Sequence, residues 1–375
     1  MDAALRREGH PEVQIIPARL AEVGGVFLKL GLVGFGGPAA HIALMQNEVV
    51  DRRGWVSRER FLDLLGATNL IPGPNSTEMA IHLGFVRAGW WGLLLAGVCF
   101  ATPATLIVLG CAWAYVRWGA LPQATSLLYG IKPVLIAIVA QALVRLARTA
   151  WTGPLAGATA LGVAALALAG VDEVLLLFAG ALGVMLATNV RPGMRCLSVA
   201  PVTLPALGLL FLKVGSILFG SGYVLLAFLR ADLVERLGWI SDAQLLDAVA
   251  VGQLTPGPVS TTATFIGYLV AGGPGAVVAT LGIFLPSFVL VAASTPLLPK
   301  LRASRWAGAF LDGANAASLA LMAVVTWQLG RAALVDWITA LLALGATLLV
   351  FGTRVHSAWL IAGGAALGLA VRGLA

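Results

Sequence analysis

The feature that most limits the fold of this chain is a set of long apolar stretches that contain no charged residue. No Asp, Glu, Lys or Arg occurs within 88–116, 149–171 or 248–299. A helix needs about 20 mostly apolar residues to cross the hydrocarbon core of a bilayer. The first two stretches can each hold one crossing and the third can hold more than one. The chain is therefore predicted to cross a membrane many times, with the lipid bilayer as its solvent.

The composition supports this prediction and excludes several other classes of protein. Of the 375 residues, 59% are hydrophobic and 11% are charged, whereas a soluble domain carries about 25% charged residues. The net charge of +7 comes from short basic clusters between apolar runs. Such clusters orient a membrane protein by remaining in the cytoplasm. We therefore expect no nucleic-acid partner.

The residues that usually form metal, redox or catalytic sites show no suitable spacing. Three cysteines form no CxxC pair, and four histidines form no HExxH pattern. Buried cysteines without such spacing behave as small apolar residues. The sequence also lacks a nucleotide-binding loop and a convergent set of nucleophile and base. We expect no metal, no cofactor and no catalytic residue, so the chain is not predicted to be an enzyme.

An internal repeat divides the chain into two halves. Residues 27–78 align without a gap on 211–262, and 20 of the 52 positions are identical, including a Pro-Gly-Pro sequence at 72–74 and 256–258. The join between the halves is polar and rich in turn-forming residues. The predicted domains are therefore 17–190 and 200–375.

Each half is predicted to contain a broken helical hairpin followed by ordinary spans. The Pro-Gly-Pro sequence separates two apolar pieces of only about 11–13 residues, roughly 16–20 Å of helix, which is too short to cross. Such pieces are typical of re-entrant hairpins whose tips meet near the middle of the membrane. The predicted pieces are 61–71 with 75–87, and 245–255 with 259–271. The predicted spans are 89–116, 122–144, 150–170 and 173–189, then 275–298, 306–329, 334–351 and 355–372.

Loop charge predicts that the two halves are inverted. The segment 51–60 holds four arginines, while its counterpart 235–244 holds one arginine and two acidic residues. The positive-inside rule places the first segment in the cytoplasm and the second outside. The predicted fold class is an all-α polytopic membrane protein with two homologous, inverted-topology halves and broken, re-entrant helices. If the glycine-broken first segment of each half does not cross the membrane, the halves would be parallel.

The two Pro-Gly-Pro breaks are the candidate substrate site. Each break precedes a helix start that carries serine and threonine, and helix N-termini present unpaired N–H groups and a positive dipole end. Two facing starts would form a neutral pocket of donors suited to a small tetrahedral dianion. The alternative is that these hydroxyls merely cap their helices. The predicted site residues at the breaks are Gly73, Asn75, Ser76, Thr77, Gly257, Ser260 and Thr261.

A glycine-broken segment and a matched lysine precede the breaks in both halves. Lys29 and Lys213 could supply positive charge to the pocket, or could extend to the membrane surface. The glycine-break residues in the predicted site are Gly36, Gly37, Gly220 and Ser221.

Four further charged residues are candidates for a structural or functional role. Glu78 aligns with Thr262 of the second half, so it has no acidic counterpart. It is a candidate for proton coupling, or it interacts favourably with the dipole of its own helix. Asp63 and its match Asp247 are expected to pair with neighbouring arginines. Lys132 is a further buried cation whose counterpart is Asn315, so a symmetric role is excluded.

The motifs resemble the chromate ion transporter (CHR) family, in its long-chain, two-domain form. The strings that carry the resemblance are Gly34-Phe35-Gly36-Gly37-Pro38, Gly54-Trp55-Val56-Ser57 and 67–74 in the first half, and Phe219-Gly220-Ser221-Gly222 and 252–258 in the second. The resemblance covers almost the whole chain. It implies export of chromate from the bacterial cytoplasm, across the inner membrane, driven by the electrochemical gradient, with sulfate as a competing analogue and chromate resistance as the outcome.

Three alternative functions and the oligomeric state remain open from the sequence. A carrier of sulfate or another oxyanion, in either direction, would use the same kind of pocket. A membrane-embedded enzyme is disfavoured by the missing catalytic set, and a channel by the inverted halves. A homodimer is an open alternative to a monomer.

Overall fold

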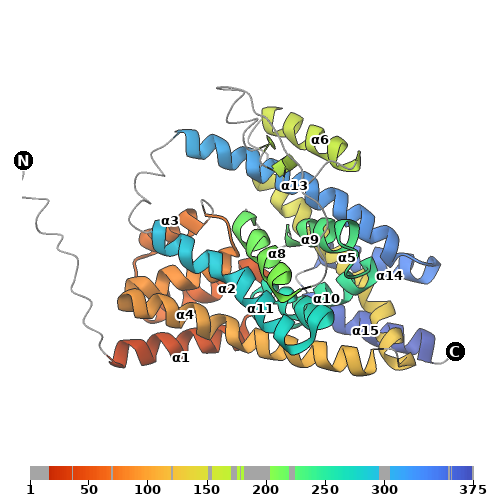
Figure 1. Cartoon of the computed structure of the whole chain (residues 1–375), viewed down its shortest axis with the longest axis horizontal. Coiled ribbons are helices and arrows are strands. Elements are labelled where there is room, and N and C mark those ends of the chain that lie inside the picture. Colours follow the sequence, from red (N-terminus) through yellow and green to blue (C-terminus); the bar gives the residue numbers. More distant parts are fainter. Residues whose placement is uncertain are drawn as a thin grey trace, which may run out of the picture.

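The computed structural model describes residues 17–35, 37–68, 71–119, 121–150, 154–169, 175–177, 179–180, 203–218, 224–294, 305–353, 355 and 357–373. All regular structure in these ranges is helical, and no strand occurs among them. Figure 1 shows the helices packed as one body along a long axis. The predicted all-α class is confirmed.

The first half contains seven described helical elements. They are α1 (Pro17–Val33), α2 (Gly37–Gln46), the π-type turn η1 (Asn47–Arg52), α3 (Arg58–Thr68), α4 (Asn75–Trp118), α5 (Pro122–Ala150) and α6 (Pro154–Leu168). The predicted glycine break separates α1 from α2, and the Pro-Gly-Pro break separates α3 from α4. Within the predicted span 173–189, residues 175–177 and 179–180 are described and helical, and its other residues lie outside the described ranges.

The second half repeats this order. Its elements are α8 (Leu204–Ile217), α9 (Leu225–Leu229), the π-type turn η2 (Arg230–Arg236), α10 (Asp242–Leu254), the 3₁₀ turn η3 (Val259–Thr261), α11 (Thr262–Ser294), α13 (Arg305–Ala333), α14 (Trp337–Gly352) and α15 (Ser357–Gly373). Helices α5 and α13 match end to end, with the second 183 positions after the first. The two halves are therefore homologous along their length.

The helix after each Pro-Gly-Pro break bends once, at the boundary that the sequence predicted. In α4 the bend lies at Ala88 (φ −143°) and Gly89 (φ +61°), and in α11 it lies at Ala271 (φ −142°) and Gly272 (φ +61°). Glycine adopts this positive φ without the steric cost that other residues meet. The short piece after each break thus doubles back on the long helix that follows.

Several predicted spans are described as helices of fewer than 18 residues. Among the described residues, four helices are long and apolar enough to cross a membrane, namely those at 75–118, 122–144, 259–294 and 316–333. The predicted spans at 150–170, 334–351 and 355–372 correspond to α6, α14 and α15, which are described over 15, 16 and 17 residues. Proline begins α6 and Asp336 caps α14, and both residue types favour helix starts. Large apolar side chains such as Leu281 (63% exposed) face outward, as expected in lipid.

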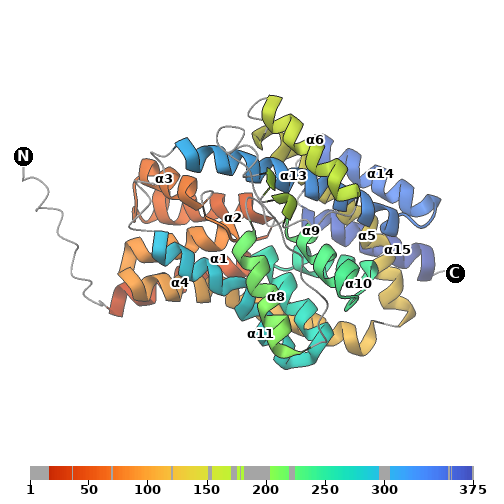
Figure 2. The same cartoon turned by 45° about the horizontal axis from the view of Figure 1, so that its top comes forward.

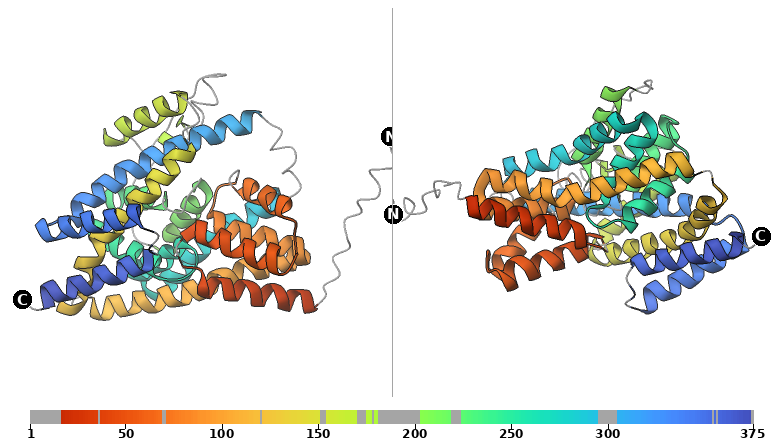
Figure 3. Two further views of the ribbon diagram at one scale, coloured as in Figure 1. Left: turned by 180° about the vertical axis from the view of Figure 1, so that it is seen from behind. Right: turned by 90° about the horizontal axis from the view of Figure 1, so that it is seen from below.

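Matched pairs of helices pack both within each half and between the halves. Within the halves, α1 lies along α4 as α8 lies along α11. Between the halves, α5 contacts α14 and α15, and α6 contacts α13. Figure 2 shows α6 and α13 together, and Figure 3 shows α15 beside α5. Helices α4 and α11 also contact each other across the halves. The regions around the two breaks are thereby buried between the halves.

Close helix packing at the bend gives a first testable prediction. A Cβ on Gly84 would meet the backbone carbonyl of Gly92, so alanine at position 84 forces the hairpin apart. We expect Gly84→Ala to cost about 1–3 kcal/mol, measured as a lower Tm of the protein in detergent. Gly110 in the same helix has open space around it. Gly110→Ala should be neutral or slightly stabilising, and equal losses for both variants would contradict this packing argument.

Candidate functional site

The first Pro-Gly-Pro break is held by the opposite half of the molecule. The Gly73 N–H donates a hydrogen bond of 2.7 Å to the carbonyl oxygen of Leu218, at the end of α8. Gly73 has φ +151°, a conformation that residues other than glycine rarely adopt. Proline on either side leaves this glycine as the N–H donor of the tip.

The second break makes the equivalent contact in the other direction. The Gly257 N–H donates a 2.7 Å hydrogen bond to the carbonyl oxygen of Gly34, at the end of α1. A Cβ on Gly257 would lie 2.6 Å from the Cβ of Ala104 in α4. Reciprocal contacts of this kind are the mark of a two-fold arrangement, in which residue i of one copy meets residue j of the other. The two tips therefore dock into the interface between the halves.

The serine and threonine side chains after the breaks are deeply buried. Ser76, Thr77, Ser260 and Thr261 are at most 2% exposed. Neither helix start has a side-chain cap, because Pro74 and Pro258 occupy the cap position. Among the described residues, the hydroxyls of Thr77 and Ser260 have no hydrogen-bond partner, while Thr261 donates to the Pro258 carbonyl oxygen at 2.9 Å. A hydrogen bond within its own turn thus accounts for the Thr261 hydroxyl, while the Thr77 and Ser260 hydroxyls remain available.

Glu78 lies inside this site. Its side chain is 0% exposed, and neither carboxyl oxygen has a partner among the described residues. If Gly73 carried a Cβ, that atom would lie 2.6 Å from Ser287 Oγ in α11 and closer still to Glu78 Oε1. The tip of the first half, the Glu78 carboxyl and the Ser287 hydroxyl therefore converge on one point. The Ser287 hydroxyl is also fully buried, and no described residue forms a hydrogen bond with it.

Sequence reasoning missed Ser287 and left His82 unassigned. Ser287 aligns with Ala104 of the first half, so the repeat gave no signal for it. His82 lies one turn after Glu78 and is 1% exposed, and its Nε2 has no partner among the described residues. Unpaired buried polar atoms in a membrane protein are costly and mark candidate functional positions.

The glycine break of the first half carries a histidine that the second half lacks. The Gly34 carbonyl oxygen accepts a second hydrogen bond, of 2.8 Å, from His41 Nε2, and the His41 ring lies edge-on to Phe100. Gly37 is buried with φ +78° and begins α2. The other predicted residues of the breaks, Gly36, Gly220 and Ser221, lie outside the described residues.

The two predicted lysines form ion pairs that occur in both halves. Lys29 Nζ lies 3.3 Å from Glu48 Oε2, and Arg52 pairs with the same oxygen at 3.1 Å. Lys213 Nζ lies 2.9 Å from Asp232 Oδ2, and Arg236 pairs with Asp232 at 3.0 Å. The structure thus places both lysines against acidic residues of η1 and η2. A contact with the transported anion stays a prediction.

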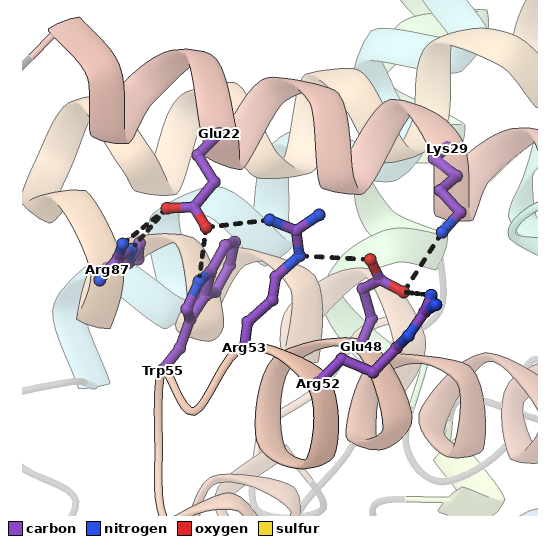
Figure 4. A network of polar contacts seen from close by, with 7 residues as sticks. All are labelled: Glu22, Lys29, Glu48, Arg52, Arg53, Trp55 and Arg87. Carbon is purple, nitrogen blue, oxygen red and sulfur yellow. Dashed lines mark hydrogen bonds and ion pairs between the residues drawn. The ribbon is translucent and has the colours of Figure 1, made fainter.

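In the first half this cluster extends to the bend of α4. Figure 4 shows Arg53 bridging Glu48 and Glu22, while Glu22 also accepts hydrogen bonds from Trp55 and from Arg87 at 2.6 Å. Arg87 directly precedes the bend residue Ala88. The cluster therefore joins α1, η1 and the bend in one network.

Replacing Glu48 tests this network. Burial opposes ionisation of Glu48, but hydrogen bonds from Arg52, Lys29 and Arg53 outweigh it and lower the pKa. We expect Glu48→Gln to cost about 1–2 kcal/mol at neutral pH, a modest loss because the three cations are partly solvated. A lowered pKa means that this stabilisation is present above the unfolded-state pKa and is lost as pH falls through the folded-state pKa.

The measurement is the Tm in detergent as a function of pH. The difference between wild type and Glu48→Gln should shrink on acidification. Asp51→Asn neutralises an exposed carboxylate of the same turn, so it serves as the control and should change stability little. Equal losses in both variants, or a difference that does not change with pH, would refute the role of Glu48.

Asp247 pairs across the halves, which corrects the expectation of neighbouring arginines. Lys132 Nζ of α5 lies 3.0 Å from Asp247 Oδ1, and the Tyr115 hydroxyl of α4 donates a 2.8 Å hydrogen bond to Asp247 Oδ2. Asp247 is 3% exposed. The partners come from the opposite half because α10 packs against both α4 and α5.

The chain resembles known proteins over almost its whole length. Residues 21–185 and 205–369 each match the family described as Chromate transporter. A chromate transport protein of Cupriavidus metallidurans is 35% identical over 362 residues, covering 91% of this chain and 90% of that protein. A probable chromate transport protein of Synechococcus elongatus is 34% identical, covering 87% and 88%. A chromate transport protein of Pseudomonas aeruginosa is 32% identical, covering 81% and 80%. No solved structure matches the chain.

Proposed function

The chain belongs to the chromate transporter family, and we propose that it is a secondary transporter that exports chromate from the bacterial cytoplasm by alternating access. As a family member it is a multi-pass membrane protein. Its substrate class is a small tetrahedral oxyanion that binds between the two Pro-Gly-Pro tips. The family is one of transporters, and we propose no enzymatic activity.

The observation that carries this proposal is the buried pair of tips with unpartnered hydroxyls. The Thr77 and Ser260 hydroxyls are donors without charge of their own, as are the backbone amides that begin α4 and η3 ahead of Thr77 and Thr261, whose own N–H groups donate to Pro74 and Pro258. Helix N-termini bind phosphate-like anions through such amides and the helix dipole. A chromate dianion offers four oxygens, so it can accept from both tips at once. Asn75 and Ser76 on the first tip complete the proposed donor set.

The charge of the substrate favours export. Moving one charge across 100 mV is worth about 2.3 kcal/mol, hence about 4.6 kcal/mol for a dianion. A cell interior at negative potential therefore drives chromate outward without another ion. Import against the same potential would need cotransported cations. We place proton uptake and release at Glu78, the buried carboxyl beside the first tip. Through this residue a pH gradient also drives chromate export.

Sulfate is the second candidate substrate. It shares the shape and charge of chromate, so the same donors would bind it. Nothing in the pocket chemistry separates the two anions, whereas the names of the relatives favour chromate.

Transport in inside-out vesicles tests the proposed function. Vesicles that contain the protein should accumulate labelled chromate when a membrane potential, positive inside the vesicle, is imposed. Unlabelled sulfate should compete, and an uncoupler should abolish accumulation. Absence of both chromate accumulation and chromate exchange would refute the proposal.

We propose that the halves are inverted, which labelling can test. Asp51 and Glu235 are aligned and both exposed. In a background without native cysteines, Asp51→Cys should react with a membrane-impermeant reagent only from the cytoplasm, and Glu235→Cys only from outside. Labelling of both from one side would overturn the inverted arrangement.

A further inference from the structure

In the cluster of Lys132, Asp247 and Tyr115, Asp247 is matched by Asp63 in the repeat, whereas the lysine and the tyrosine have no like residue at the aligned positions. With the 183-position offset that relates α5 to α13, Lys132 aligns with Asn315 and Tyr115 aligns with Leu298. The pairs of Lys29 with Glu48 and of Lys213 with Asp232, in contrast, occur in both halves. A contact needed to fold each half would be expected twice. The unmatched cluster therefore points to a task that the molecule performs once.

The position of Lys132 is unusual for a cation. It lies near the middle of the apolar stretch 122–144, whereas Arg117 and Arg331 lie near helix ends. A charge at this depth is costly in lipid and marks a substrate path or relay by default. Its side chain is 19% exposed, and among the described residues Asp247 is its ion-pair partner. An ammonium has three donors, so two remain for a further acceptor.

Asp247 connects this lysine to the second tip. It lies in α10, which continues to Thr255 and the Pro-Gly-Pro sequence at 256–258. The cluster is carried by three helices, of which α4 and α5 belong to the first half and α10 belongs to the second. Any movement of one half against the other would therefore change the distance between Lys132 and Asp247. In the proposed topology the cluster lies between the tips and the outside.

We propose that Lys132 is a second anion-binding residue, on the exit side of the tips, and that Asp247 occupies its ammonium group when no anion is bound. This inference rests on the proposed function. The anion leaving the tips displaces Asp247 from Lys132, because its two charges and several oxygens interact more strongly with an ammonium than a single carboxylate does. Asp247 keeps the hydrogen bond from Tyr115 in both states. Asp247 thus sets how tightly the anion is held.

The proposal predicts opposite effects for the two partners. Asp247→Asn leaves Lys132 without its competitor and retains an acceptor for Tyr115, so anion affinity should rise about tenfold while turnover slows. Lys132→Asn, the residue found at the aligned position of the second half, should weaken affinity at least tenfold. The double variant Lys132→Asn/Asp247→Asn removes both charges, so folding should recover while affinity remains low.

The experiment measures binding of labelled chromate and sulfate to the purified full chain, with Tm recorded for each variant. Lys132→Asn alone leaves the Asp247 carboxylate without its ion-pair partner and could therefore fail to fold. In that case the affinity is measured on the double variant instead. Arg230→Gln is the matched control, because Arg230 pairs with Asp242 and Glu235 away from this cluster. It should lower stability and leave anion affinity unchanged.

Two results would overturn the proposal. If the double variant binds and transports like the wild type, the pair is structural only. If Asp247→Asn fails to raise affinity, Asp247 does not compete with the anion. Both results leave the proposed function intact when the wild type transports chromate. A wild type that neither binds nor transports either anion refutes the proposed function, and this inference falls with it.

Discussion

Gly73→Ala is expected to abolish chromate transport. The added Cβ would lie where the Glu78 carboxyl and the Ser287 hydroxyl converge, with Ser287 Oγ only 2.6 Å away. The φ of +151° at Gly73 is also unfavourable for any residue that carries a Cβ. The tip would have to withdraw from Leu218 and lose its 2.7 Å hydrogen bond. We expect a loss of at least a hundredfold in the rate of chromate uptake by inside-out vesicles.

A control variant distinguishes the steric clash expected in Gly73→Ala from the effect of backbone strain. Gly54 has φ +58° and nothing near its missing Cβ. Gly54→Ala therefore introduces strain of about 1–2 kcal/mol without a clash and should retain most transport. If both variants transport equally well, the convergence of Gly73, Glu78 and Ser287 is not part of the site. Expression and Tm of both variants show whether a loss reflects unfolding.

Glu78→Gln is expected to uncouple transport from the pH gradient. The amide has nearly the shape of the carboxyl but cannot take up or release a proton. Glu78 is fully buried and has no partner among the described residues, so no neighbouring ion pair would hide the effect. Chromate binding should stay within a few-fold of the wild type. Transport driven by an imposed pH gradient should fall at least tenfold, while exchange of chromate across the membrane persists.

Glu59→Gln is the matched control for this variant. Glu59 is an exposed glutamate in the first turn of α3, so its neutralisation should leave both binding and transport unchanged. A Glu78→Gln protein that responds to the pH gradient like the wild type would show that Glu78 is only a dipole partner of its helix.

The bend in α4 shows how much of the fold can be read from local sequence. The predicted boundary between 75–87 and 89–116 coincides with the bend at Ala88 and Gly89. Proline and glycine act through their own backbone preferences, and lipid requires long apolar helices. The repeat then extends every local prediction from one half to the other. These effects depend on neighbouring residues, so they can be predicted without knowing the tertiary structure.

The ion pairs show where such prediction stops. Lys29 was predicted either to face the anion pocket or to extend to the membrane surface, and neither prediction included the ion pair that it forms with Glu48. Asp247 was predicted to pair with a neighbouring arginine, but it pairs with Lys132, more than a hundred positions away. A repeat alignment identifies equivalent residues. It does not say which half supplies the partner of each.

Hydrophobicity, proline and glycine act locally, so the amino-acid sequence alone predicts a membrane-embedded, two-half, all-α protein with a broken hairpin in each half. The docking of each tip against the opposite half, through Gly73 with Leu218 and Gly257 with Gly34, follows from the packing of the folded chain. The same packing brings Ser287 to Glu78 at the first tip. These contacts link residues far apart in the chain, and they are fixed by how whole helices pack rather than by the preferences of any segment.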